Sequence, residues 1–162
     1  MRKGISKAER RKAMRVAEKH AGLLDSGSGQ LATIPEFLDR GAFNAVYALS
    51  ADLVLRIQLK ASEEDSSWNF YEVAQLYPHP ALPTVWELGE FKGYKFAIVE
   101  RMECTLHALE ARGRPVSREA AKANAAEHLM AVSGKGVHDT HDCNIMKRRK
   151  KDEFVLVDCC LG

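Results

Sequence analysis

The chain has few cysteines, which argues against a disulfide-stabilised protein, and no long apolar run, which argues against a membrane-spanning one. Its four cysteines, at positions 104, 143, 159 and 160, form no regular disulfide framework. Adjacent cysteines such as Cys159 and Cys160 are rarely bridged to each other, because the ring would be strained. No apolar run reaches the roughly 20 residues of a membrane helix, and the N-terminus lacks the apolar segment of a signal peptide. We therefore expect a soluble, cytoplasmic protein with reduced thiols.

The charge of the chain is small in sum but unevenly distributed. The 162 residues carry a formal net charge of +2, and 46% of them are hydrophobic, which suffices for one compact or small two-lobed domain. Residues 1–24 hold eight Lys or Arg and two Glu, which leaves 16 basic and 20 acidic residues in the rest. The body is thus mildly acidic, and residues 1–24 are a candidate site for an acidic partner.

A basic helix is predicted over residues 7–21. Ser6 and Glu9 fit a capping box, and Gly22 is a natural helix stop. The predicted apolar face is narrow, so we expect the helix to be docked weakly or free in solvent, as a detachable arm. This face consists of Ala13, Met14, Ala17 and Ala21. Residues 25–30 are rich in Gly and Ser, which predicts a flexible linker.

The next part of the chain predicts a five-stranded antiparallel sheet with one helix. In the third strand, Leu53, Leu55 and Ile57 alternate with Val54 and Arg56. Arg56 therefore faces away from the aliphatic side, on a face that could line a pocket. The expected strands are residues 32–38, 44–49, 52–59, 84–90 and 95–100.

The helix between the third and fourth strands begins near Ser62 and ends before Pro78. In it, Glu72 lies four residues from both Trp68 and Leu76, which places a carboxylate on an apolar face. Such a carboxylate requires a nearby cation.

The last third of the chain predicts mainly helix, followed by a hairpin. Helices are expected over about 105–111 and from a cap at Ser117 to Gly134. Residues 147–152 read as the exposed turn of a hairpin that follows. Strands first and helices second indicate an α+β fold with a cleft between its halves.

Three polar residues near the C-terminus form the candidate catalytic centre. Asp139 is followed by four residues and Asn144, and a hairpin then leads to Asp158 at the end of an apolar strand. In metal-assisted phosphoryl transfer, Asp139 would orient the attacking hydroxyl. Asn144 and Asp158 would supply oxygen ligands to Mg²⁺. By itself the spacing also fits an ordinary polar loop before a strand.

This motif and the order of elements resemble the protein-kinase-like fold, and closely the small serine/threonine protein kinases of short-tailed bacteriophages. The resemblance covers residues 31–162 and implies a minimal two-lobed fold, with an N-lobe at 31–102 and a truncated C-lobe at 103–162. It also implies ATP and Mg²⁺ as cofactors. The implied reaction is phosphate transfer to Ser or Thr, on the protein itself or on a host protein during phage infection.

The resemblance assigns roles to several upstream residues. Residues 41–47, with Gly41 and Phe43, are similar to the glycine-rich loop that covers the phosphates. Arg56 takes the place of the phosphate-binding Lys, and Glu72 that of its helix partner. The residues implied to contact adenine are Val46 and Val54 around the base and Glu100 and Met102 at the hinge.

The sequence departs from the family in three respects. Only one glycine of the glycine-rich loop remains, although Asn44 can tolerate left-handed backbone geometry. Arg56 is longer than Lys and planar, so the two are not equivalent. Asp158 is followed by Cys159 and Cys160 instead of Phe-Gly, and the sequence has no counterpart to the family's activation segment.

Three other readings stay open. The first is a pseudokinase or host-directed binding or inhibitor module without catalysis. The second is a zinc site built from His138, His141 and Cys143 with Cys159 or Cys160, whose ligand types suit tetrahedral zinc. The third is nucleic-acid binding through residues 1–24 and 147–151.

Overall fold

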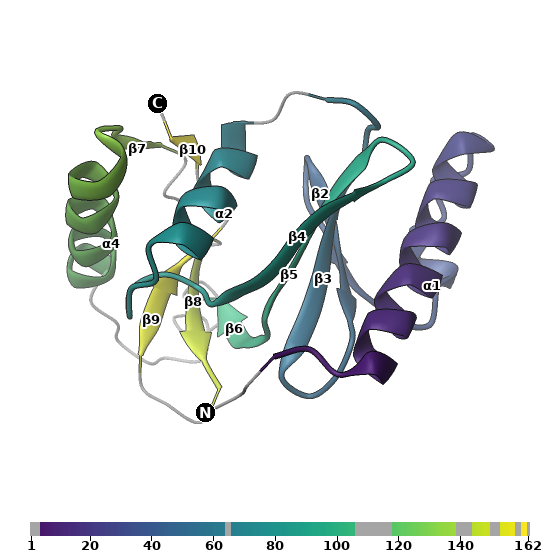
Figure 1. Cartoon of the computed structure of the whole chain (residues 1–162), viewed down its shortest axis with the longest axis horizontal. Coiled ribbons are helices and arrows are strands. Elements are labelled where there is room, and N and C mark those ends of the chain that lie inside the picture. Colours follow the sequence, from purple (N-terminus) through teal and green to yellow (C-terminus); the bar gives the residue numbers. More distant parts are fainter. Residues whose placement is uncertain are drawn as a thin grey trace. The chain divides into compact units, whose positions relative to one another are not determined.

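The structure is a computed structural model that describes residues 4–63, 66–105, 118–138, 144–149, 153–157 and 160–161. The chain forms two compact units. Unit 1 comprises Met1–Glu64 and Val85–Glu100, and unit 2 comprises Asp65–Thr84 and Arg101–Gly162. Helices and antiparallel strands both occur, so the architecture is the expected α+β (Figure 1). No helix among the described residues is long and apolar enough to cross a membrane.

Unit 1 contains the predicted five-stranded antiparallel sheet. Its strands have the order β1-β2-β3-β5-β4, so β1 and β4 are the edges and β3 lies in the centre. Hairpins join β1 to β2, β2 to β3 and β4 to β5, and β3 pairs with β5 along Leu53 to Ile57. The strands are β1 (Phe37–Arg40), β2 (Asn44–Ala48), β3 (Leu53–Gln58), β4 (Val85–Phe91) and β5 (Tyr94–Glu100).

The first strand begins later than predicted. The segment Leu31–Thr33 forms a short 3₁₀ helix, η1, and β1 starts only at Phe37. The amide of Ile34 donates to the carbonyl of Leu31 at 3.0 Å, which closes this turn locally. Pro35 follows and has no N–H to offer to a strand ladder. The prediction of a strand over 32–38 is therefore wrong for residues 32–36.

Helix α1 (Lys7–Asp25) opens unit 1 and begins with the predicted capping box. The Glu9 amide donates to Ser6 Oγ at 3.1 Å, and the Ser6 amide donates to Glu9 Oε2 at 2.9 Å. The predicted stop at Gly22 is wrong, because the helix continues to Asp25. The left-handed position that commonly follows a helix end is taken by Gly27, with φ of 81°.

The packing of α1 contradicts the expectation of a weakly docked, detachable arm. One side of the helix is buried and belongs to the same hydrophobic core as the inner sheet residues. Small side chains let the helix approach the sheet closely, so a narrow apolar face suffices for tight packing. Met14 was assigned to this face but is 41% exposed. The buried positions of α1 are Ala13, Val16, Ala17, His20 and Ala21.

In the residues of unit 2 that the structure describes, two helices combine with short strands. Strands β6, β8 and β9 form one antiparallel sheet, and β7 pairs with β10 in another. Gly134, with φ of 70°, ends α4 as predicted. Of the helix expected at 105–111, Thr105 belongs to β6 and the remainder lies outside the described residues. The elements are α2 (Ser66–Leu76), β6 (Met102–Thr105), α4 (Arg118–Ser133), β7 (Val137–His138), β8 (Ile145–Arg148), β9 (Phe154–Leu156) and β10 (Cys160–Leu161).

The predicted hairpin after Asn144 is present as β8 and β9, but its basic residues are not all in an exposed turn. Lys147 is only 7% exposed, and its Nζ donates to Glu103 Oε2 at 2.8 Å. Arg148 is still in β8, where its amide donates to the Glu153 carbonyl at 2.9 Å. The strand continues two residues further than expected because these long side chains find acceptors within unit 2.

Candidate active site

The sheet of unit 1 brings three of the predicted site residues to one face. Val46 lies directly opposite Arg56 across the β2–β3 ladder, and Arg56 lies opposite Ala97 of β5. Directly opposite residues share a face of a sheet, as do residues two apart along a strand. Val46, Val54 and Arg56 therefore share one face. The core with α1 contains their neighbours Leu53, Leu55 and Ile57, so the predicted alternation of β3 is confirmed.

A buried histidine fixes α1 to the end of β3. His20 is fully buried, with its Nε2 2.7 Å from the carbonyl oxygen of Gln58 and its Nδ1 2.7 Å from the Tyr47 hydroxyl. A carbonyl can only accept, so Nε2 carries the proton and Nδ1 accepts from Tyr47. Desolvation by burial lowers the pKa of His20 and favours this neutral form.

The same region holds β3 to its neighbours through Gln58. The side-chain Nε2 of Gln58 donates to the Glu63 carbonyl at 3.2 Å, and its side-chain Oε1 accepts from the backbone amide of Lys95 at 3.1 Å. Nearby, the Tyr94 hydroxyl donates to Asp25 at 2.7 Å. Burial, and then this hydrogen bond, raise the pKa of Tyr94 to about 12. The strand that carries Arg56 is thus fixed from α1 and from β5.

The segment that resembles a glycine-rich loop is the β1–β2 hairpin. The Gly41 amide donates to the Asn44 carbonyl at 2.8 Å, and the Phe43 ring is 49% exposed at the tip. A Cβ at position 41 would meet only the Asn44 carbonyl oxygen, at 3.7 Å. The described fold therefore does not itself require glycine there. Asn44 begins β2 and is not among the residues with positive φ, so it does not use left-handed geometry.

The predicted partners Arg56 and Glu72 lie in different units. Arg56 is half-buried on β3 of unit 1, and Glu72 is exposed on α2 of unit 2. Leu76 is also 70% exposed, so the helix face that was read as apolar is buried only near Trp68. Burial does not force Glu72 to find a cation, and that premise was wrong. The pair itself stays a prediction.

Two backbone pairings connect the segments that contain Asp139, Asn144 and Asp158. Asn144 is 8% exposed, and its carbonyl accepts from the amide of Val157, the residue before Asp158, at 2.8 Å. His138, the residue before Asp139, is the antiparallel partner of Cys160. Asp139 and Asp158 themselves lie outside the described residues.

The predicted hinge leads from β5 into β6. Glu100 is the last residue of β5, opposite Leu53, and Met102 is the first of β6, opposite Arg148 in β8. The strand after Asn144 therefore pairs with the strand that carries Met102. Of the predicted site residues that the structure describes, Met102 belongs to this three-stranded sheet, and Asn144 immediately precedes its strand β8.

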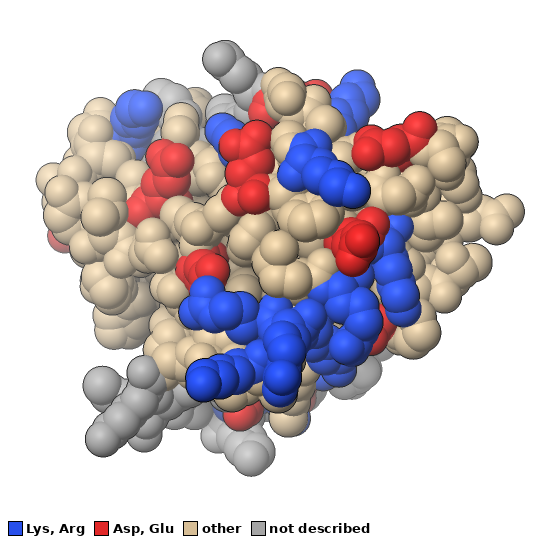
Figure 2. Space-filling view, turned by 45° about the vertical axis from the view of Figure 1, so that its right-hand side comes forward, with Lys and Arg blue, Asp and Glu red and all other residues tan. Residues whose placement is uncertain are grey.

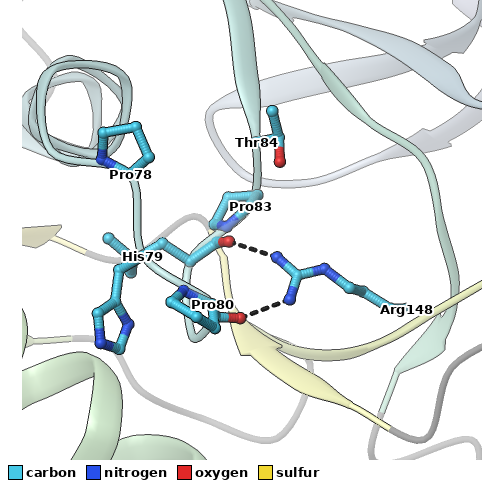
Figure 3. Close-up of a pocket in the computed structure, with 7 residues that line it drawn as sticks. Pro78, His79, Pro80, Pro83, Thr84 and Arg148 are labelled. Carbon is cyan, nitrogen blue, oxygen red and sulfur yellow. Dashed lines mark hydrogen bonds between the residues drawn. The ribbon is translucent and has the colours of Figure 1, made fainter. Parts of the chain in front are cut away.

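The residues that line a cavity of about 270 Å³ in unit 2 include none of the predicted catalytic, nucleotide-binding or magnesium-binding residues (Figure 3). Arg148 reaches into the proline-rich segment beside it. Its Nη1 donates to the Pro80 carbonyl at 2.5 Å and its Nη2 to the Leu82 carbonyl at 2.7 Å. This clamp was missed, because five successive basic residues indicate a solvated turn. The same run of basic residues also concealed the burial of Lys147, although strand alternation from the apolar Ile145 would have marked Lys147 as inward-facing.

A second feature of this segment was also not predicted. The His79 and His128 rings stack with their centroids 4.3 Å apart. His79 Nδ1 accepts from the Ala81 amide at 3.0 Å, and His128 Nε2 donates to the Tyr77 carbonyl at 2.9 Å. The pKa of His79 is lowered, first by desolvation and then by His128. These contacts join α4 to the segment after α2.

The zinc reading remains untested. In the part of the chain that the structure describes, no group of three His, Cys, Asp or Glu side chains is placed to hold a metal ion. His141, Cys143 and Cys159 lie outside the described residues. The β7–β10 register does place His138 opposite Cys160.

Comparison with solved structures shows that the fold is protein-kinase-like. No protein-family model matches the chain, and no curated protein matches its sequence. The structure is similar to a cysteine-to-alanine variant of the PknI kinase domain from Mycobacterium tuberculosis, with a TM-score of 0.60 and 18% identity over 76% of this chain and 57% of that one. It is also similar to Rad53 in complex with AMP-PNP, with a TM-score of 0.59 and 18% identity over 77% of this chain and 37% of that one. The chain thus spans about half or less of each match.

Proposed function

We propose that the chain binds ATP and Mg²⁺ and transfers the γ-phosphoryl group to a Ser or Thr hydroxyl. The observation that carries the proposal is the grouping of Val46, Val54 and Arg56 on one sheet face within a kinase-like fold. In such a fold, apolar residues there would contact the base and a cation would contact the phosphates. The acceptor would be a residue of the protein itself or a host protein during phage infection.

The polar residues of unit 2 supply the remaining chemistry. The Asn144 amide oxygen and the Asp158 carboxylate are hard oxygen donors, which suit Mg²⁺. When bound, this ion would neutralise charge on the phosphates. The new bond forms between the hydroxyl oxygen and the γ-phosphorus as the bond to the β–γ bridging oxygen breaks, and Asp139 accepts the hydroxyl proton.

The first experiment separates binding from catalysis. Metal ligands contact the phosphates before and during transfer, whereas a hydroxyl-orienting carboxylate acts only as the new bond forms. Asp158→Ala should therefore weaken the Mg²⁺-dependent thermal shift given by ATP. Asp139→Asn should keep that shift but lose transfer of labelled phosphate by roughly a hundredfold or more. The absence of any ATP shift in the wild-type protein would refute the enzyme proposal.

The second candidate function is a partner-binding module that uses the same scaffold without catalysis. The presence of Arg56 favours it, because a planar guanidinium replaces a compact ammonium at the position that would contact phosphate. Arg56→Lys distinguishes the two candidates. For an enzyme limited by this residue, Lys should maintain or raise transfer, whereas a binding module should show no transfer with either residue.

A further inference from the structure

The outer face of α1 carries a row of basic side chains. Lys7, Arg11, Arg15 and Lys19 follow each other at intervals of four residues and are all exposed. Residues at this interval lie on one side of a helix, about 6 Å apart along the axis, so the row spans about 18 Å. The buried side chains of α1 lie on the opposite side, against the sheet. We call these four residues the α1 basic row.

Among the residues that the structure describes, one ion pair neutralises part of this positive charge. Arg15 has Glu36 as a partner, at 3.7 Å. Lys7, Arg11 and Lys19 form no ion pair with any residue that the structure describes. Figure 2, which brings the α1 side of the molecule forward, shows Lys and Arg side chains gathered into one area. The charge is therefore available to an external anion.

Hydrogen bonds to the sheet fix the helix that carries the α1 basic row. His20 holds α1 to Tyr47 and Gln58, and Asp25 accepts from Tyr94. At the other end, Arg10 donates to Glu87 of β4 at 2.7 Å. The helix backbone need not become ordered when a ligand binds, which removes one cost of association.

The chemistry of this face favours a nucleic acid over a protein. Protein interfaces have few charged residues at their centre and are enriched in aromatic side chains. Here the centre is charged, α1 contains no aromatic residue other than buried His20, and its one exposed large apolar residue is Met14. Without an aromatic platform there is no stacking on single-stranded bases. The repeating charge of a duplex backbone remains as the ligand.

We propose that the α1 basic row binds the phosphate backbone of double-stranded nucleic acid without reading its sequence. Binding of this kind releases counterions, and the logarithm of the affinity falls with the logarithm of salt concentration with a slope near −0.9 per neutralised phosphate. Four cations predict a slope of about −3.6. Affinity should then fall by about a hundredfold between roughly 50 and 200 mM salt.

The test uses the full chain and a fluorescent DNA duplex of about 20 base pairs, which is longer than the row. Fluorescence anisotropy would give the affinity at several salt concentrations. The double variant Lys7→Glu and Arg11→Glu should reduce binding at low salt at least tenfold and lower the slope by about two. The matched control, Lys60→Glu with Lys135→Glu, makes the same change in net charge at exposed positions outside the row. It should keep most of the binding.

Three results would overturn the proposal. They are no binding at the lowest salt concentration, equal losses in the row variant and the control, and tighter competition by poly-glutamate than by unlabelled duplex. The last would assign the row to an acidic protein. Circular dichroism of both variants checks that α1 is still folded. The outcome is independent of ATP binding, because the row and the proposed nucleotide face are made of different residues.

Discussion

The two faces of the unit 1 sheet differ in what determines their residues. On one face, Leu53, Leu55 and Ile57 pack with α1 and are excluded from solvent. On the other, the half-buried Arg56 has Val46 opposite it on β2 and Val54 two residues earlier on β3. The first face is explained by burial of apolar surface. An arginine on the second face is not, and a residue type that packing does not explain is where function should be sought.

The largest expected effect distinguishes the two faces through neighbours on β3. Leu55→Ala removes a side chain that is fully buried against α1, and should lower the free energy of unfolding by about 2–5 kcal/mol. Arg56→Met, one residue further, should change it by less than about 1 kcal/mol while removing the Mg²⁺-dependent ATP shift. Urea denaturation and thermal shift assays measure both. Equal losses of stability would mean that both faces are structural.

The next effect tests the histidine that fixes α1. His20→Gln keeps a donor and an acceptor but loses the ring packing, and should cost about 1–3 kcal/mol. Since the folded pKa of His20 is lowered, the unfolded chain binds the proton more readily. Wild-type stability should therefore be complete above about pH 6.5 and fall as the pH drops below it, by up to about 1.4 kcal/mol per pH unit.

The variant cannot titrate at position 20, so the difference between the two proteins isolates this residue from His79 and the other histidines. Denaturation curves between about pH 5 and 8 provide the measurement. Parallel pH dependence of the two proteins would show that His20 is not neutral in the fold.

Two glycines offer a smaller and more selective test of the same contrast. A Cβ at Gly89 would lie 2.5 Å from Cζ of the Phe96 ring, on the face covered by α1. Gly89→Ala should therefore cost about 1–3 kcal/mol. Gly41→Ala has room and should change stability by less than about 0.5 kcal/mol, but should weaken ATP binding if the hairpin backbone approaches the phosphates. The reverse pattern would remove the support for a phosphate-binding hairpin.

The smallest expected effect concerns the proposed pair of Arg56 and Glu72. A double-mutant cycle with Arg56→Met and Glu72→Gln measures the coupling free energy directly. Because Glu72 is exposed, solvent screening should keep the coupling at or below about 1 kcal/mol. Strictly additive losses would show that Arg56 does not depend on Glu72.

The sequence predicted the parts of the fold that follow from periodicity. Strands β2 to β5, the two faces of β3 and the end of α4 at Gly134 could be derived from alternation and from helix signals, whereas the start of β1 could not. The core role of α1 could not, because Ala13 and Ala17 carry little apolar surface, and His20 appears polar although its partners bury it. Lys147, like His20, is polar in the sequence but buried by its partner. Its partner Glu103 lies 44 residues earlier, and no local pattern indicates that distance.

The candidate site was predictable as a set of residues but not as an arrangement. Val46, Val54 and Arg56 share a face because the register of β2 with β3 places 46 opposite 56. The register depends on hairpin geometry that the residue pattern does not fix. The clamp of Arg148 on two carbonyls depends on the path of a proline-rich segment, which has no periodicity from which to predict it.

The anchoring of α1 also determines when the protein can fold. The helix is synthesised before its hydrogen-bonding partners, which lie 38 residues after His20 at Gln58 and 69 residues after Asp25 at Tyr94. Chains emerge from the ribosome at about 5–20 residues per second. Several seconds therefore pass between the synthesis of α1 and that of β5, the strand that completes the sheet surface against which α1 packs. During that interval the hydrophobic residues of α1 are accessible to chaperones, because the sheet that buries them is not yet complete.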